Sequence, residues 1–317
     1  MVCERKAGSN LRLNFLLITI LLLTMFVAGC GSEKKNPSRP GDDSAAFTFV
    51  DDIGRKVTVI RPERLVSLTP SSTEILFALG LGDKVVGVDD YSNYPAAALK
   101  IDKVGAYDKP SLEKIVALKP DLVLADSIHE EAVKRLEEMG ISVAVVFPSD
   151  LEEVLTGIRW IGIATGARDR AVELEAELTE RIRLVDEKVA SIPEQERPWV
   201  YYEVSSEPIM TAGPKTLSSE LIVRAGGRNI AHDAATDYPE FSPEAIVSRN
   251  PDVIIFPEIH GTDAVEVETI KARPGWGTVE AVQNGRLYSV DADILSRPGP
   301  RVVEALEKMM RLFHPGI

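Results

Sequence analysis

The 317-residue sequence has few cysteines, a deficit of positive charge and none of the common catalytic motifs. Cys3 and Cys30 are its only cysteines, so no site built from several cysteines can form. The net charge of -13 argues against a nucleic-acid-binding surface. G-x-S-x-G, P-loop, H-E-x-x-H and G-x-G-x-x-G motifs are all absent. We therefore expect a binding protein, with no cofactor and no resident metal.

The chain also lacks an apolar run long enough to span a membrane, which takes roughly 18 or more residues. Phe15 to Val27 is apolar except for two threonines and ends in Val27-Ala28-Gly29-Cys30. This resembles the lipobox of bacterial lipoproteins, which implies cleavage before Cys30 and attachment of lipid, palmitate included, to that residue. The expected location is the cell membrane, facing outside the cytoplasm and anchored through Cys30 only. The alternative is an ordinary signal peptide with a chance cysteine.

Short apolar runs that alternate with helical patterns follow this segment. Phe47 to Val50 and Val57 to Val59 flank a turn at Gly54, which predicts a hairpin. The alternation further along predicts an α/β fold with parallel-rich sheets and flanking helices. Ser71 to Leu79 reads as a helix in which Ser71 and Glu74 have capping-box spacing.

An internal repeat indicates that this fold has two lobes. The segment from Ser111 to Leu124 reappears from Ser242 to Ile255, with six identical positions and the same hydrophobic register. A second echo pairs Ser72-Thr-Glu74 with Ser218-Ser-Glu220, each followed six residues after the glutamate by a glycine. A repeat at this long period predicts two related lobes rather than a solenoid.

One long helix is expected to join the lobes. Apolar residues at spacings of three and four run through residues 170–191, over roughly 33 Å of helix. Glu177 and Arg181 are spaced for an i,i+4 ion pair on it. The expected divisions are a signal peptide over residues 1–30, a flexible tether over 31–46, a first lobe over 47–168, the connecting helix over 169–193 and a second lobe over 194–317.

Several residue pairs are candidates for binding. Glu113 and Glu244 each follow an N-cap serine by two residues. Because the segment is duplicated, they could be two exposed carboxylates that dock on a two-fold partner. The alternative is that each only stabilises its own helix, since a first-turn glutamate interacts favourably with the helix dipole. His129 and His260 lie at matching offsets just past a strand. They could oppose each other across a cleft as metal ligands or ligand contacts, or be loop histidines without a role. Asp293 and Arg297 could pair with each other or bind amides and carboxylates in a cleft.

Two aromatic loops add to these candidates. Tyr91-Ser92-Asn93-Tyr94-Pro95 and Asp237-Tyr238-Pro239 follow apolar runs. They are either packed turns or an aromatic lining for a large flat ligand.

With these segments assembled, the chain resembles the solute-binding proteins of ABC importers for cobalamin, iron–siderophore complexes and haem. The resemblance covers residue 47 to the end and is strongest at 47–59, 64–70, 91–95, 111–124, 273–276 and 293–301. It implies two α/β lobes joined by one long helix. It also implies that Glu113 and Glu244 engage arginines of a dimeric permease, which works with an ATPase.

The 91–95 loop is most similar to the cobalamin branch of that family. This implies that the ligand is cobalamin or a related corrinoid, and that its contacts are Tyr91, Tyr107, Met210, Tyr238, Asp293 and Arg297. The chain also departs from that branch. Tyr107 and Tyr238 stand where a cobalamin receptor carries Trp, Met210 where it carries Phe, and Asp126 at a further aromatic position, so the cleft is less aromatic and more acidic. An Fe(III)–siderophore or haem receptor is the nearest alternative. A lipid-anchored enzyme acting in the cleft and a structural lipoprotein are the alternatives from other classes.

Overall fold

The computed structural model describes residues 46–258 and 267–317. The predictions for the signal peptide, Cys30, the tether up to residue 45 and His260 therefore lie outside the described residues. No helix in the described ranges is long and apolar enough to cross a membrane.

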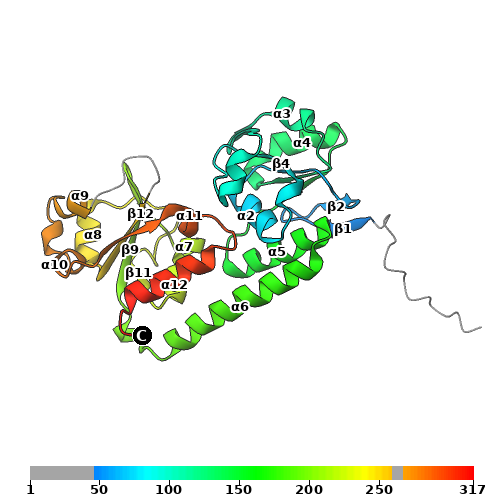
Figure 1. Cartoon of the computed structure of the whole chain (residues 1–317). Coiled ribbons are helices and arrows are strands. Elements are labelled where there is room, and N and C mark those ends of the chain that lie inside the picture. Colours follow the sequence, from blue (N-terminus) through cyan, green and yellow to red (C-terminus); the bar gives the residue numbers. More distant parts are fainter. Residues whose placement is uncertain (1–45, 259–266) are drawn as a thin grey trace, which may run out of the picture. The chain divides into compact units, whose positions relative to one another are not determined.

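Two separate sheets form the centres of two lobes (Figure 1). The first sheet has four parallel strands in the order β4-β3-β7-β8, with β3 at Leu65–Ser67, β4 at Val85–Val88, β7 at Leu122–Ala125 and β8 at Val143–Val145. The second has the order β10-β9-β12-β13, with β9 at Trp199–Ser206, β10 at Ile209–Thr211, β12 at Val253–Glu258 and β13 at Leu287–Asp291. A short strand, β11 (Arg228–Asn229), pairs with β9 in parallel, and β10 is antiparallel to β9. The predicted α/β fold is confirmed.

Small elements complete the first lobe. The hairpin of β1 (Phe47–Val50) and β2 (Lys56–Val59) forms as predicted, with Phe47 opposite Val59. A second hairpin joins β5 (Gly105–Ala106) and β6 (Lys109–Pro110).

Short 3₁₀ turns occur in both lobes, at η1 (Gly82–Lys84), η2 (Ala96–Lys100), η3 (Ser127–His129), η4 (Glu194–Glu196) and η5 (Trp276–Thr278).

Each strand of the first sheet sends alternate side chains to opposite faces, as the period of a strand requires. Leu122 and Leu124 face a cluster with α2 (Pro70–Ala78) and α5 (Leu151–Thr165). Val123 and Ala125 face α3 (Leu112–Ala117) and α4 (Glu130–Glu138). The sheet is thus buried on both faces, which explains why its strands read as continuous apolar runs.

The second sheet is covered in the same way. Val253 and Ile255 face α7 (Leu217–Arg224), α11 (Ala292–Ser296) and α12 (Val302–Phe313). Ile254 and Phe256 face α8 (Pro243–Arg249), α9 (Val267–Lys271) and α10 (Glu280–Gln283), with Trp276 fully buried among them.

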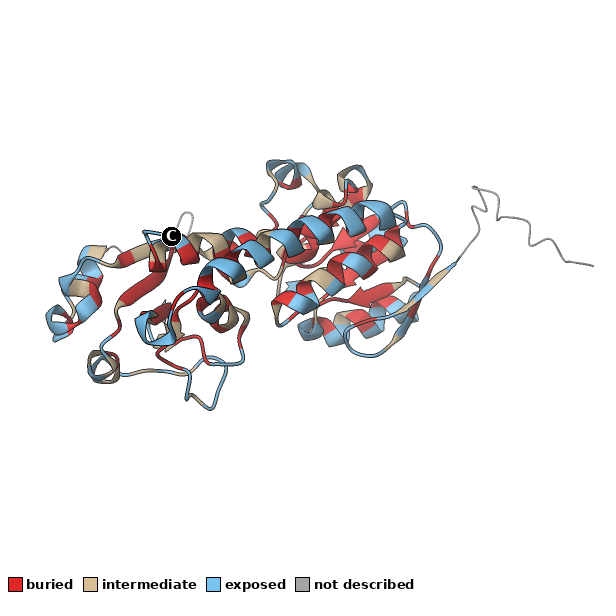
Figure 2. Cartoon of the chain, turned by 90° about the horizontal axis from the view of Figure 1, so that it is seen from below, coloured by how far each residue is buried: buried red, intermediate tan, exposed pale blue. Residues whose placement is uncertain are grey.

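The connecting helix is α6 (Arg168–Ala190). Its predicted stripe, Ala171, Leu174, Leu178, Ile182, Val185 and Val189, is buried, and Figure 2 shows the opposite face of the helix exposed. This stripe belongs to one hydrophobic cluster that contains residues of both lobes, from Leu65 to Phe313. Burial of apolar surface therefore holds the two lobes and the helix together.

The Glu177–Arg181 pair predicted on this helix is replaced by a bond between helices. Arg181 donates from Nε and Nη2 to the Glu307 carboxylate of α12, at 2.8 and 3.0 Å. A bidentate fork of this kind is a stronger contact than a single exposed i,i+4 pair, so Arg181 turns toward α12.

The main repeat is one helix–strand unit used twice, as α3–β7 and α8–β12. Ser111 and Ser242 cap the two helices by accepting from the N–H groups of Lys114 and Ala245. The Pro-Asp aspartate of each copy then ties its strand to the neighbouring one. Asp121 accepts from the Arg64 N–H at 2.8 Å before β3, and Asp252 accepts from the Trp199 N–H of β9 at 2.7 Å.

The capping box predicted for Ser71 and Glu74 is wrong. Thr69 is the N-cap of α2 and accepts from the Ser72 N–H at 3.1 Å. Pro70 explains the shift, because proline at the first helical position lacks the N–H that would be unpaired there. Glu74 is consequently free to point away from the helix start.

Candidate functional site

A cavity of about 610 Å³ opens at the carboxyl ends of the first sheet's strands. Thr69 and Ser71 follow β3, Tyr91 follows β4, and Asp126 follows β7. Parallel strands bring such residues to one edge of a sheet, where ligands of α/β proteins bind. The second lobe contributes the segment from Ser296 to Pro298. The cavity is therefore lined by both lobes.

Buried hydrogen bonds hold the Tyr91 loop in place. Asp89 is 1% exposed and accepts from the Tyr91 N–H at 2.9 Å and from the Ser92 hydroxyl. Ser92 also contacts the Thr73 hydroxyl of α2 at 2.8 Å. Burial raises the pKa of Asp89, although its hydrogen bonds to Ser92 and Tyr91 oppose that shift. The backbone of the loop is fixed, while the Tyr91 side chain stays exposed to the cleft.

Tyr107 reaches the same cavity from the turn between β5 and β6, and its hydroxyl donates to Asp126 Oδ2 at 3.0 Å. Burial, helped by the Asp126 charge, holds the pKa of the Tyr107 phenol well above its ordinary value. Because its proton is committed to Asp126, the phenol oxygen has only lone pairs to offer a ligand. Asp126 Oδ1 is also occupied, by the Ile128 N–H and the Ser127 hydroxyl.

His129 lies beneath this pair and is only 2% exposed. Its Nδ1 accepts from the Asp126 N–H at 2.9 Å, and its Nε2 bonds the Tyr107 carbonyl. Both ring nitrogens are thus engaged with the backbone that positions Tyr107 and Asp126. His129 therefore supports this loop through its two ring nitrogens, a role that neither of the predicted alternatives included.

Arg297 of the second lobe forms hydrogen bonds with residues of the first lobe. Its guanidinium lies 2.7 Å from Asp293, donates to Asn93 Oδ1 at 2.7 Å and donates to Glu74 at 3.4 Å. Asn93 in turn donates to Asp293 at 3.1 Å. The Asp293–Arg297 ion pair therefore forms, and Arg297 also lines the cavity.

The predicted contacts are only partly brought together. Tyr91, Tyr107 and Arg297 line the cavity, whereas Met210, Tyr238 and Asp293 lie outside its lining. Met210 is on β10, and Tyr238 is 52% exposed in the loop that follows β11. Reasoning from the sequence missed Thr69, Ser71, Asp108 and Ser296. Their positions after strands and turns are the signal that could have identified the first three.

The two glutamates of the repeat lie in the first turns of α3 and α8. Both side chains are exposed, and neither forms an ion pair with any other residue of the described ranges. Hydrogen bonds from the backbone N–H of Glu244 itself and from the Ser242 hydroxyl lower the pKa of the Glu244 carboxyl. No group of three or more histidine, cysteine or acidic side chains suited to a metal occurs among the residues that the structure describes.

Two lobes joined by one long helix, with a cavity that both lobes line, are the architecture of a solute-binding protein. Residues 65–294 match the periplasmic binding protein family. The chain belongs to this family, whose members are solute-binding transport proteins and not enzymes.

Three relatives illustrate the range of the family. The chain is 36% identical to YvrC of Bacillus subtilis (strain 168), an uncharacterized ABC transporter substrate-binding lipoprotein, over 93% of this chain and 95% of that protein. It is 30% identical to a vitamin B12-binding protein of Vibrio campbellii (strain ATCC BAA-1116), over 79% of this chain and 89% of that one. Among solved structures, the periplasmic heme-binding protein RhuT from Roseiflexus sp. RS-1 superposes with a TM-score of 0.72 at 29% identity, covering 80% of this chain and 98% of that one.

The chain is thus an ABC transporter substrate-binding protein of the cobalamin, haem and siderophore group, which works with permease and ATPase components.

We predict that His129→Ala lowers the free energy of unfolding by about 1–3 kcal/mol, because the Asp126 N–H and the Tyr107 carbonyl lose their partner. The control is His232→Ala. His232 is exposed and makes one bond to the Asn229 carbonyl and one ring contact with Trp199, so its loss should change stability by less than about 1 kcal/mol. Urea denaturation measures both. Equal effects of the two substitutions would contradict a supporting role for His129.

Proposed function

We propose that this protein captures cobalamin or a related corrinoid in the cleft and delivers it to its permease. The observation that carries this proposal is the cavity that combines Tyr91 and Tyr107 of the first lobe with Arg297 of the second. Tyrosine offers a large apolar area with a polar end, which suits a wide ring system. The vitamin B12-binding relatives support the same ligand.

The polarity of the cavity favours an uncharged ligand with many amides. On the first lobe, the Tyr107 oxygen and the carboxylates of Asp108 and Asp126 are hydrogen-bond acceptors. On the second lobe, the Arg297 guanidinium is a donor. Amide groups both donate and accept hydrogen bonds, so those around a corrin ring can bond to the acceptors of the first lobe and to the donor of the second. A ligand rich in carboxylates would meet Asp108 and Asp126 instead, and like charges repel.

Haem or an Fe(III)–siderophore complex is the second candidate, and similarity to a heme-binding structure favours it. Haem needs an axial ligand. His129 has both ring nitrogens engaged and His260 lies outside the described residues, so Tyr91 is the group of the cavity lining that would have to bind the iron. Anionic iron chelates need several cations, and Arg297 is the one basic residue among the described residues lining the cavity. The geometry therefore supports the corrinoid better.

We predict that cyanocobalamin binds the purified protein with micromolar or tighter affinity in calorimetry. Tyr91→Ala should weaken binding about tenfold, the equivalent of about 1.4 kcal/mol for a lost aromatic contact. Leu99→Ala is the control, because Leu99 is as exposed as Tyr91 (61% against 60%) and lies outside the cavity lining. Absence of binding heat at micromolar concentrations would exclude cobalamin as the ligand.

We also propose that Glu113 and Glu244 dock the protein on a two-fold permease. They occupy equivalent positions in the repeat, one in each lobe, and both are exposed without an ion-pair partner in the described part of the chain. Two equivalent carboxylates on related units match a partner that presents two equivalent basic sites.

We predict that Glu113→Ala combined with Glu244→Ala leaves cyanocobalamin affinity unchanged and lowers uptake into cells at least about tenfold, since a few central contacts dominate an interface. The matched control is Glu152→Ala combined with Glu280→Ala, which removes an exposed first-turn glutamate from α5 and from α10. Normal uptake by the first double variant, or equal loss in both, would contradict the docking role.

We further propose that lipid on Cys30 anchors the protein to the outer face of the cell membrane. The Val27-Ala28-Gly29-Cys30 sequence and the similarity to a substrate-binding lipoprotein support this. Two or more acyl chains give stable attachment without electrostatic help from an acidic protein.

We predict that mass spectrometry of the membrane fraction finds a mature N-terminal peptide that begins with lipidated Cys30. Cys30→Ala should remove the lipid and prevent this processing. An unmodified Cys30 in a protein released from the membrane would contradict the anchor.

A further inference from the structure

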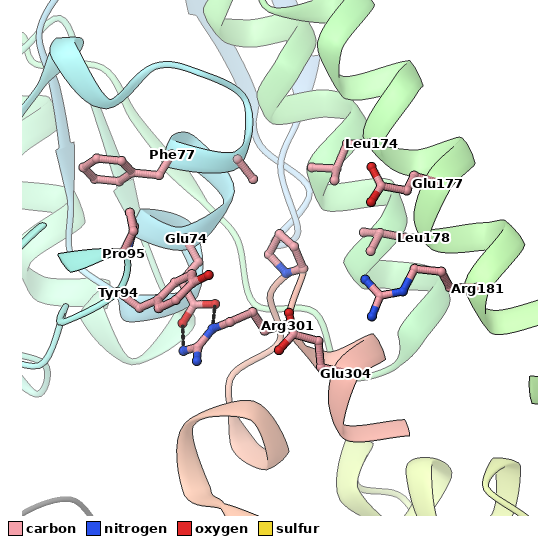
Figure 3. Close-up of a pocket in the computed structure, with 12 residues that line it drawn as sticks. Glu74, Phe77, Tyr94, Pro95, Leu174, Glu177, Leu178, Arg181, Arg301 and Glu304 are labelled. Atoms are coloured by element: carbon pink, nitrogen blue, oxygen red, sulfur yellow. Dashed lines mark hydrogen bonds and ion pairs between the residues drawn. The ribbon is translucent and has the colours of Figure 1, made fainter. Parts of the chain in front are cut away.

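Glu74 of α2 is a buried carboxylate that bonds across the two lobes. Its side chain is 2% exposed, and it accepts from Arg301 Nη2 at 2.6 Å and Nε at 2.9 Å. Arg301 belongs to the second lobe, and its guanidinium lies 3.9 Å from the centre of the Tyr94 ring. Figure 3 shows this arrangement beside a second cavity, of about 290 Å³, that is distinct from the ligand cleft.

Glu220 of α7 makes the reciprocal contact, as an acceptor in the second lobe for a donor in the first. It belongs to the second lobe and accepts at 3.0 Å from the N–H of Leu151, the first residue of α5 in the first lobe. A first-turn N–H has no partner within its own helix, so an outside carboxylate satisfies it. Arg224 lies 3.4 Å from Glu220 and also forks onto Asp186 of α6 at 2.9 Å.

These two glutamates are the matched residues of the second sequence echo. Each is followed six residues later by a glycine with positive φ, Gly80 at +76° and Gly226 at +82°, where the helix ends. Each lobe therefore uses its own copy of the same segment to bond the other lobe. The pairing is reciprocal, as expected of two related halves.

Glu74 is also connected to the ligand cleft through Arg297. Arg297 donates to Glu74 at 3.4 Å and is one of the residues that line the cavity. Its other acceptors are Asn93, Asp293 and the Tyr91 carbonyl. Glu74 thus anchors a residue that faces the ligand but is itself absent from the lining.

We propose that Glu74 and Glu220 are positioning residues that fix the spacing of the two lobes and, through Arg297, the binding geometry of the cleft. The proposal rests on the proposed function insofar as the cleft is the ligand site. Neither glutamate needs to touch the ligand. Loss of the Glu74 charge leaves Arg301 without its bidentate partner. It also leaves Arg297 with one charged acceptor fewer at the lobe boundary.

The test compares Glu74→Gln with Glu203→Gln. Glu203 is an equally buried carboxylate, 1% exposed, and it binds Arg273 through both oxygens. Both partners of that pair lie in the second lobe, so Glu203→Gln removes a similar ion pair without affecting contact between lobes. Hydrogen–deuterium exchange and cyanocobalamin dissociation are measured on the full, lipidated chain in detergent.

For Glu74→Gln we expect faster exchange in peptides on both sides of the lobe boundary, around residues 91–94 and 297–301. Cyanocobalamin should dissociate about tenfold faster, because differences between variants of one site fall mainly in the dissociation rate. For Glu203→Gln we expect faster exchange around β9 and Arg273 only, with dissociation unchanged within about twofold.

Glu220→Ala is the second variant, because its partly exposed site tolerates substitution if Glu74→Gln fails to fold. Alanine, unlike glutamine, has no oxygen to accept from the Leu151 N–H, so the variant should speed exchange of that N–H and of the first turn of α5. Equal exchange and dissociation for the Glu74 and Glu203 variants, or an unchanged Leu151 N–H in Glu220→Ala, would overturn the proposal. If wild-type protein does not bind cyanocobalamin, the proposed ligand fails, and the exchange data alone decide the role of the glutamates.

Discussion

The buried ion pair between Glu74 and Arg301 is the constraint on which the cleft depends. A carboxylate that is 2% exposed is stable only when it is fully paired, and its partners come from the opposite lobe. Removing one partner by substitution would leave the other charge buried and unpaired at the lobe boundary, which costs about 3–5 kcal/mol. Desolvation is the largest single effect on the pKa of Arg301 and lowers it. The hydrogen bond and charge of Glu74, together with the charges of Asp291 and Asp293, outweigh this effect, so the pKa of Arg301 is raised.

The hydrophobic core also holds the two lobes together, over a larger surface than the ion pair. One cluster runs from the first sheet through α5 and α6 to α7 and α12, so residues 44–317 form one compact unit. The parallel strands end at the edge of the first sheet, and that edge supplies the first-lobe wall of the cleft.

Much of this fold was predictable from the sequence, because it depends on local rules. The hairpin, the buried stripe of α6 and the serine caps of the repeated helices follow from periodicity and capping. Interactions between distant segments were not predictable. Pro70 moved the start of α2 to Thr69, and Arg181 pairs with Glu307, 126 residues away. At the site, Tyr91, Tyr107 and Arg297 of the predicted contacts line the cavity, whereas Tyr238, Met210 and Asp293 do not. The hydrogen bonds of His129 to the backbone of Asp126 and Tyr107 depend on tertiary contacts that the sequence does not show.

The central claim is that the cleft holds a corrinoid, and the most direct measurement is native mass spectrometry of protein purified without added ligand, combined with elemental analysis. The account predicts a bound species with the mass of a corrinoid and cobalt that copurifies with the protein. Copurified iron with the mass of haem or of a siderophore complex would contradict it.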